Sequence, residues 1–430
     1  MKRYVISSLA LLLLSGVSLA SSVYDYEYPI KNPLLATVIG TPIEFQAVLP
    51  KKIRRSVKSI VVFPDRVQPP FTPSKKMPFT LVSQKKKAAP LIFNIAGTGA
   101  SHASPKMQMM EKAFYQAGFH VVSLPSPTYF SFIMRASTQQ VPGHIVQDSA
   151  DLYRVMELIY EQIRDKVEVT EFYLTGYSLG GAQAAFVAKL DEERKLFNFK
   201  KVLMINPPVS LFNSVSILDK MLEDNIPGGP ENFDAFFNDI MNRFSETYSH
   251  LDQVNFNDDF LYNIYKEGPQ NPTEEELARV AALIGLSFRI SSSNMIFMSD
   301  LATNDGYILP KNHVLTTTQT TTGYFKVAAR ISFTDYFNER FYPYFSARER
   351  GLTRDELENE LSLTSIANYL ATADKISVVH NEDDIILQPG EIDFFRTTFQ
   401  SRAHIYPHGG HCGNMSYKDN VSYMINYFAN

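Results

Sequence analysis

The chain has 430 residues, of which 45% are hydrophobic and 20% charged, and it carries a net charge of −4. This composition is typical of a globular protein with a sizeable core. It does not favour nucleic acid or an anionic membrane as the main partner, because both require a concentrated basic face. A small molecule or a neutral lipid is the compatible class of partner.

The first 20 residues have the pattern of a signal peptide. The positive pair Lys2-Arg3 precedes an apolar stretch over 5–14, and Ser18-Leu19-Ala20 offers the small residues of a cleavage site. The stretch is short for a bilayer span, so a membrane anchor is the alternative. We expect residues 1–20 to be removed, leaving a secreted or periplasmic protein without a stable membrane span. Cys412 is the only cysteine, so no intramolecular disulfide can form.

Short apolar runs in the chain predict a sheet. Residues 43–49 and 59–63 are expected to be strands, with a proline-rich loop over 64–78. From Pro90, apolar runs alternate with segments of helical periodicity, which indicates a parallel sheet covered on both faces. The predicted strands of this part are 91–95, 120–124, 171–175, 201–205, 375–380 and 404–406.

The alternation stops between the strand at 201–205 and the strand at 375–380. The intervening residues show mostly helical periodicity, and Thr273 with Glu276 and Thr353 with Glu356 each fit a capping box. We therefore predict a helical insertion over 208–372. It would interrupt one core domain made of residues 21–207 and 373–430.

Gly176-Tyr177-Ser178-Leu179-Gly180 fits the pattern G-x-S-x-G. It follows a predicted strand and begins a helix rich in small residues, which is the strand–turn–helix setting that this motif needs. The flanking glycines suit a tight turn in which any side chain would collide with the strand or the helix. Ser178 is therefore the candidate nucleophile; the alternative is a glycine-rich helix start with an incidental serine.

A serine nucleophile needs a general base and a group that orients the base. His411 is the candidate base, because it lies in the glycine-rich loop Pro407-His408-Gly409-Gly410-His411 after the last predicted strand. His408 is the second choice. Asp384 is the candidate acid, since it follows the strand at 375–380, and Asp383 remains the alternative. An oxyanion hole would use the N–H of Leu179 and an N–H of the loop after 91–95, with Thr98 as the donor.

The serine, the aspartate and the Gly-Gly-His loop, in this order, resemble the α/β-hydrolase superfamily. The resemblance covers about residues 88–210 and 373–430. It implies a mostly parallel α/β sheet with helices on both faces, and a cap or lid at 208–372. One departure, at the loop expected to supply the second oxyanion donor, is that Ala96-Gly97 stands where many members have His-Gly.

We expect a serine esterase or lipase-like enzyme that acts on a small-molecule ester or lipid through an acyl-enzyme, with no cofactor and no metal. Acyl transfer, amide hydrolysis and non-catalytic binding on the same fold are the alternatives. The predicted cap is rich in aromatic residues, which either contact substrate or pack the cap helices together. These aromatic residues are Phe333, Tyr336, Phe337, Phe341, Tyr342, Tyr344 and Phe345.

Overall fold

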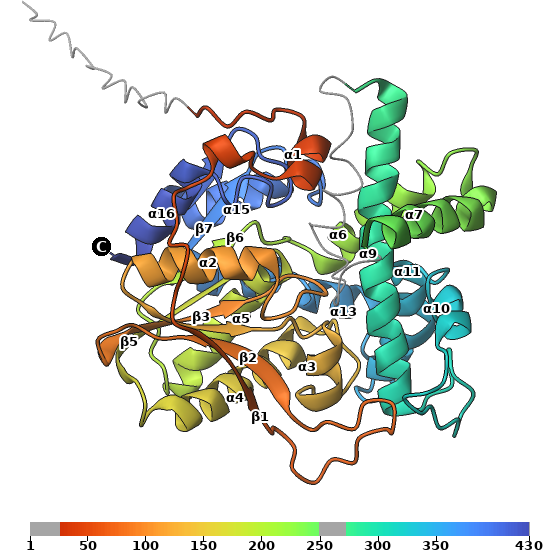
Figure 1. The fold of residues 1–430 in the computed structure, drawn as a ribbon, viewed down its shortest axis with the longest axis horizontal. Coiled ribbons are helices and arrows are strands. Elements are labelled where there is room, and N and C mark those ends of the chain that lie inside the picture. Colours follow the sequence, from red (N-terminus) through yellow and green to blue (C-terminus); the bar gives the residue numbers. More distant parts are fainter. Residues whose placement is uncertain (1–25, 249–271, 430) are drawn as a thin grey trace, which may run out of the picture.

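A computed structural model describes residues 26–248 and 272–429 of the chain, so the predicted signal peptide lies outside the described residues. Eight strands form one sheet in the order β1-β2-β4-β3-β5-β6-β7-β8 (Figure 1). β2 pairs antiparallel with β1 and β4, and all pairs from β4 to β8 are parallel. The strands are β1 (Arg55–Ile60), β2 (Met77–Val82), β3 (Ala88–Ile95), β4 (His120–Leu124), β5 (Glu168–Tyr177), β6 (Val202–Ile205), β7 (Ile376–Asn381) and β8 (Ala403–Tyr406).

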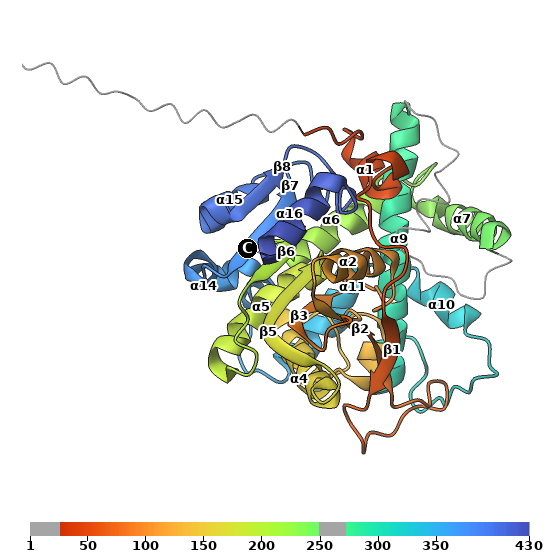
Figure 2. The same cartoon turned by 60° about the vertical axis from the view of Figure 1, so that its left-hand side comes forward.

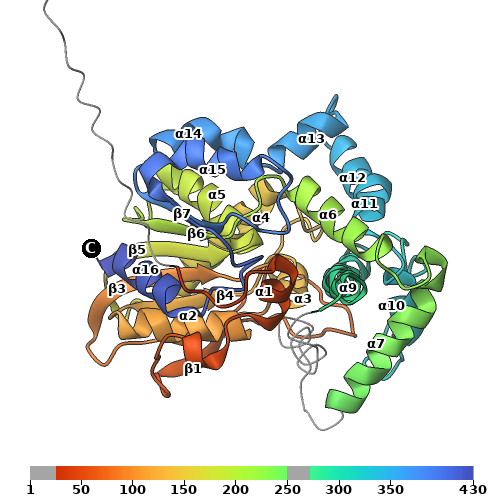
Figure 3. The ribbon, with the colours of Figure 1, turned by 90° about the horizontal axis from the view of Figure 1, so that it is seen from above.

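Helices cover both faces of the sheet, as Figure 3 shows in the view along its edge. Leu91, Phe93 and Ile95 of β3 join the core on the side of α4 (Ile145–Ile163) and α5 (Leu179–Arg194). Ile92, between them, joins the core on the side of α2 (Pro105–Gln116) and α16 (Lys418–Ala429). A strand buried on both faces needs this continuous run of apolar residues. The predicted mostly parallel α/β sheet is confirmed.

The described elements between β6 and β7 are all helical, and they include α-helices, two short 3-10 turns and the π-helical segment Phe337–Phe341. Thr273 and Thr353 form both predicted capping boxes, which begin α9 and α13. The α-helices of this part are α6 (Leu211–Glu223), α7 (Phe233–Tyr248), α9 (Glu274–Thr303), α10 (Thr322–Ala328), α11 (Phe333–Tyr336), α12 (Tyr342–Ser346), α13 (Arg354–Glu360) and α14 (Ala367–Thr372).

The 30-residue helix α9 lies beside the sheet, and α6, α10 and α11 pack against it (Figures 1 and 3). It crosses α6 closely: a Cβ on Gly285 would lie 2.6 Å from the Leu222 backbone nitrogen. By length and composition α9 is the one candidate membrane span among the described residues, but 83% of its most apolar window is buried inside the protein. Such burial is expected of the core helix of a globular protein.

Residues 26–50, which we call the N-terminal arm, run along the C-terminal part of the chain (Figure 2). The predicted strand over 43–49 is wrong. Ile43–Phe45 form a 3-10 turn, and only an isolated bridge joins Gln46 to Tyr417. The arm packs on the 407–417 loop instead of pairing with the sheet, and this leaves Ile43 and Val48 exposed.

Further differences concern short elements. The strand expected over 59–63 lies at Arg55–Ile60, and β2 begins inside the region expected to be a loop, because the two strands pair with each other over six residues. The remaining helices are α1 (Pro33–Ile39) in the arm, α3 (Phe130–Arg135) and α15 (Glu391–Phe399).

Candidate active site

Ser178 forms the turn between β5 and α5, with its backbone at φ 53° and ψ −126°. A residue other than glycine is strained at such a positive φ, by about 1–3 kcal/mol. The neighbouring glycines permit the turn: a Cβ on Gly176 would lie 2.3 Å from the Gly180 oxygen, and one on Gly180 would lie 2.3 Å from the Ile95 oxygen. The turn leaves Ser178 partly exposed at the carboxyl end of β5.

Ser178, His411 and Asp384 lie together although they come from three separate segments. His411 Nε2 lies 2.9 Å from Ser178 Oγ, and His411 Nδ1 lies 3.0 Å from both carboxylate oxygens of Asp384. The Nδ1–H therefore donates to Asp384, which leaves Nε2 to accept the hydroxyl proton of Ser178. The structure thus brings together the three residues that the sequence selects.

Asp384 and His411 each favour the charged form of the other. Burial raises the pKa of Asp384, but the His411 ring and its hydrogen bond outweigh burial and hold that pKa below the usual range. Burial also lowers the pKa of His411, yet the facing Asp384 carboxylate more than compensates and raises it well above the ordinary value. The pair therefore stabilises an imidazolium, the species that forms when histidine takes a proton from serine.

Asp384 is held by further groups that the sequence analysis did not select. Asn206, at the end of β6, donates its Nδ2–H to Asp384 Oδ2 over 3.0 Å, and the Ile386 backbone N–H donates to Oδ1 over 3.2 Å. His380 lies behind the carboxylate, and its Nε2 is 2.9 Å from the Pro207 carbonyl oxygen. Burial lowers the pKa of His380. Because His380 is then neutral, the Asp384 carboxylate has, among the described residues, only His411 beside it as a histidine that can carry the compensating positive charge.

The two alternative residues have other contacts. His408 Nε2 lies 3.0 Å from the Tyr28 carbonyl oxygen, in the N-terminal arm. Asp383 Oδ1 accepts the Gly410 backbone N–H over 2.9 Å. Asp383 thus shapes the loop that carries His411, whereas Asp384 contacts the imidazole ring itself. The hydrogen-bonded series with Ser178 therefore contains Asp384 and His411 and neither of the two alternatives.

Of the two residues expected to supply oxyanion donors, Leu179 directly follows Ser178 and Thr98 lines the same cavity. The N–H of Leu179 is the first in α5, where N–H groups have no acceptor inside the helix. The loop after β3 passes close to the serine, since a Cβ on Gly97 would lie 3.2 Å from Ser178 Cβ. Thr98 follows and lines the same cavity as Ser178. The loop is anchored by Thr128, whose Oγ1 accepts the Gly99 N–H over 2.8 Å.

A cavity of about 180 Å³ lies above Ser178, and two helices of the inserted segment form its far walls. Each helix contributes one face with the spacing i, i+3, i+4, i+7. From α6 these residues are Leu211, Ser214, Val215 and Leu218. From α9 they are Ile284, Ser287, Phe288 and Ser291. Five of these eight side chains are apolar and three are serines, so the walls formed by α6 and α9 are mainly apolar.

The aromatic residues at 333–345 have a different role. None of them lines this cavity, and Phe333, Tyr336, Phe337, Phe341 and Phe345 are buried in the core between the inserted helices and the sheet. Of the two interpretations of this aromatic cluster, packing of the helices agrees with the structure, and contact with substrate in this cavity does not. Phe288 of α9 is the aromatic side chain of the inserted segment that does reach the cavity.

The N-terminal arm reaches the candidate base. The His411 backbone N–H donates to Thr37 Oγ1 over 2.9 Å, and Thr37 also lines the cavity. Neighbouring contacts tie the same loop to the arm: Thr41 Oγ1 donates to the Gly413 oxygen, and a Cβ on Gly413 would lie 2.1 Å from the Ala36 oxygen. The arm thus supports the loop that carries His411 from behind.

The serine follows β5, the aspartate follows β7 and the histidine follows β8, all at the carboxyl edge of a mostly parallel sheet. This chain order of serine, acid and histidine at that edge decides the fold. The fold is that of the α/β-hydrolases.

No protein-family model and no curated protein matches this chain. Among solved structures, it is similar to a thioesterase domain from the curacin biosynthetic pathway, with 9% identity over 87% of this chain and 99% of that chain and a TM-score of 0.37. An esterase of Pyrococcus furiosus, Pf2001, has 9% identity over 89% of this chain and 96% of its own, with a TM-score of 0.41.

Epoxide hydrolases from metagenomes of hot environments, described as members of the α/β-hydrolase superfamily, give 15% identity over 87% of this chain and 98% of theirs, with a TM-score of 0.37. All of these likenesses are weak in identity and in superposition. The fold assignment therefore rests on the strand order and on the positions of the three residues.

Proposed function

We propose that the chain is an exported serine hydrolase that cleaves carboxylic esters with an apolar acyl chain. The observation that carries the proposal is the hydrogen-bonded series Ser178–His411–Asp384, which opens into a cavity with mainly apolar walls. The proposal of export rests on the signal-peptide pattern of residues 1–20.

In the first step Ser178 Oγ attacks the ester carbonyl carbon while His411 Nε2 takes the hydroxyl proton. The carbonyl oxygen becomes negative, and the N–H groups of Leu179 and Thr98 stabilise it. Such a donor contributes about 100- to 1,000-fold to the rate. The bond to the alcohol oxygen then breaks, and His411 returns the proton to that oxygen, which leaves an acyl-serine.

In the second step a water molecule attacks the acyl-serine. His411 removes a proton from this water, and the same oxyanion donors stabilise the second tetrahedral species. Collapse of that species releases the carboxylic acid and returns the proton to Ser178. Asp384 stays ionised throughout, which agrees with its lowered pKa, and it keeps His411 in the tautomer that can accept a proton at Nε2.

Labelling with a fluorophosphonate, followed by identification of the modified residue, tests this proposal. We expect one adduct at Ser178 and hydrolysis of p-nitrophenyl butyrate by the wild-type protein. Ser178→Ala should keep its melting temperature and lose both the adduct and nearly all turnover, because no acyl-serine can form. Labelling at another serine, or turnover retained in Ser178→Ala, would refute the proposed mechanism.

A further inference from the structure

We propose that a groove built largely by the N-terminal arm binds the alcohol part of the ester, and that this alcohol is bulky, uncharged and rich in hydroxyl groups. The inference rests on the proposed ester hydrolysis. It concerns the leaving group, whereas the cavity between α6 and α9 concerns the acyl chain.

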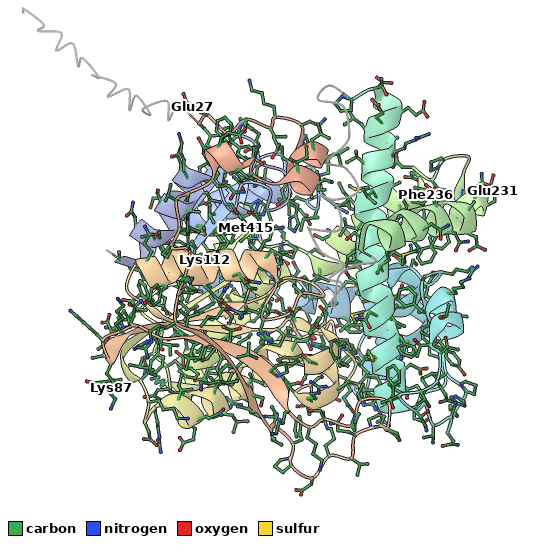
Figure 4. The ribbon with its side chains drawn as sticks, in the orientation of Figure 1. Glu27, Lys87, Lys112, Glu231, Phe236 and Met415 are labelled. Atoms are coloured by element: carbon green, nitrogen blue, oxygen red, sulfur yellow. The ribbon has the colours of Figure 1, made fainter. Side chains whose placement is uncertain are left out.

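The groove has a volume of about 440 Å³ and lies between the arm, the beginning of α2 and the 407–417 loop. We call it the arm groove. Its apolar walls include Pro42, Pro105 and Met415, the last of which is labelled above α2 in Figure 4. Glu44 and Gln46 of the arm are exposed and also line it.

The arm groove adjoins the active-site cavity. Thr37, Lys106 and Cys412 line both spaces, so the proposal places the passage between them at these three residues. Cys412 Sγ lies 3.9 Å from His411 Nε2, and Thr37 Oγ1 is bonded to the His411 backbone N–H. The passage therefore opens on the side of Ser178 where the histidine lies.

The mechanism determines which part of the ester faces this side. When the bond between the acyl carbon and the alcohol oxygen breaks, His411 Nε2 gives its proton to that oxygen, so the oxygen lies next to Nε2. A chain attached to the oxygen extends past Cys412 and Thr37 into the arm groove. The acyl chain then occupies the space between the faces of α6 and α9.

The lining indicates the chemistry of the alcohol. Glu44, Gln46 and Ser416 bring a carboxylate, an amide and a hydroxyl to the groove, all of which form hydrogen bonds with hydroxyl groups. The prolines and Met415 suit the apolar face of a polyol or sugar. Because a carboxylate and the Lys106 ammonium both line the groove, neither an anionic nor a cationic alcohol is favoured by charge alone.

Three hexanoate esters that differ only in the alcohol test this inference: those of methanol, glycerol and glucose. We expect the wild-type kcat/KM to be about tenfold higher, or more, for the glycerol and glucose esters than for the methyl ester, a difference that a few contacts supply. Ser416→Trp, which fills the groove, should lower kcat/KM for these two esters by about tenfold and leave the methyl ester nearly unchanged. Ser416 is partly buried and lies outside the catalytic group.

Val48→Trp is the matched control, because Val48 is 93% exposed on the same arm and does not line the groove. It should leave all three esters unchanged. If Ser416→Trp does not fold, Ile43→Ala decides: it removes an exposed groove side chain and should selectively weaken turnover of the glycerol and glucose esters. A uniform loss on all esters, or no loss, overturns the groove assignment. Fluorophosphonate labelling of Ser178 in every variant separates this outcome from a failure of the proposed hydrolysis.

Discussion

Thr37 and His411 are 374 residues apart in the chain, and the His411 backbone N–H donates to Thr37 Oγ1 over 2.9 Å. Thr37 Oγ1 in turn donates to the Pro33 carbonyl oxygen over 2.7 Å, within α1. The loop approaches so closely that a Cβ on Gly410 would lie 2.6 Å from the same hydroxyl oxygen. The position of the candidate base therefore depends on a segment at the other end of the chain.

Thr37→Val should lower kcat about tenfold, with a smaller effect on KM, because it keeps the side-chain shape but removes the acceptor. An N–H that loses its buried acceptor costs about 1–3 kcal/mol, which the loop would avoid by shifting His411. Thr37→Ser keeps the hydroxyl and should restore most of the activity. The pH profile of kcat/KM should also change in Thr37→Val; loss of stability alone, with an unchanged profile and kcat, would contradict a positioning role.

The rate of ester hydrolysis should rise with pH through an inflection above pH 6.5. The attack needs a neutral His411, and the Asp384 carboxylate raises the pKa of that imidazole well above its ordinary value of 6.5. Asp384→Asn removes this charge, so the inflection should move to lower pH while kcat falls by about 10⁴-fold. Asp383→Asn is the matched control and should keep the wild-type inflection. The opposite result for the two variants would assign the orienting role to Asp383.

The length of acyl chain that is cleaved best should depend on Phe288. This ring lines the cavity from α9, so Phe288→Ala lengthens the space between α6 and α9. We expect the optimum of a p-nitrophenyl ester series, from acetate to laurate, to shift to longer chains. Phe341→Leu is the comparison, because Phe341 is fully buried away from the cavity. It should lower the melting temperature and keep the profile, whereas a shift in Phe341→Leu alone would show that the cavity is bounded differently.

The stability of the fold should depend on pH through Asp148, at the beginning of α4. Burial raises the pKa of this carboxyl from 3.8 to about 8, against the opposing hydrogen bond from the Gly143 N–H. Between these two values the unfolded chain releases a proton that the folded chain retains, so the free energy of unfolding decreases as pH rises from about 4 to about 8.

Asp148→Asn removes this titration and should therefore melt at a progressively higher temperature than the wild type over that pH range, with no further change above about pH 8. Thermal unfolding at several pH values measures the difference. A difference between the two proteins that stays constant from pH 4 to pH 9 would show that Asp148 is ionised in the folded state.

The sequence was sufficient to predict the sheet and the three central residues because each carries a local constraint. The turn at Ser178 needs glycines at fixed positions, and parallel strands buried on both faces appear as apolar runs. Asn206 has no such signal, because an asparagine directly after a strand is a common turn residue. Thr37 has no local signal at all, because its role comes from a contact with the far end of the chain.

The prediction of a strand over 43–49 failed for a related reason. Alternating apolar residues indicate a strand only when a sheet edge is near, and here the segment packs on the 407–417 loop with Ile43 and Val48 exposed. The aromatic cluster at 333–345 shows the same limit. Its composition does not distinguish rings that touch substrate from rings that pack helices, and only the fold places them in the core.

The contact between the arm and the 407–417 loop also constrains the order in which the molecule is assembled. The arm is synthesised before the His411 loop, so its contacts with that loop form only after the intervening residues have been made. Closing a loop of this length costs only slightly more entropy than closing a shorter one, but contacts so distant in sequence slow the folding search. Ser178 and its turn are synthesised before the candidate base His411. A growing or truncated chain that lacks the 407–417 loop therefore lacks the group proposed to take the proton of Ser178.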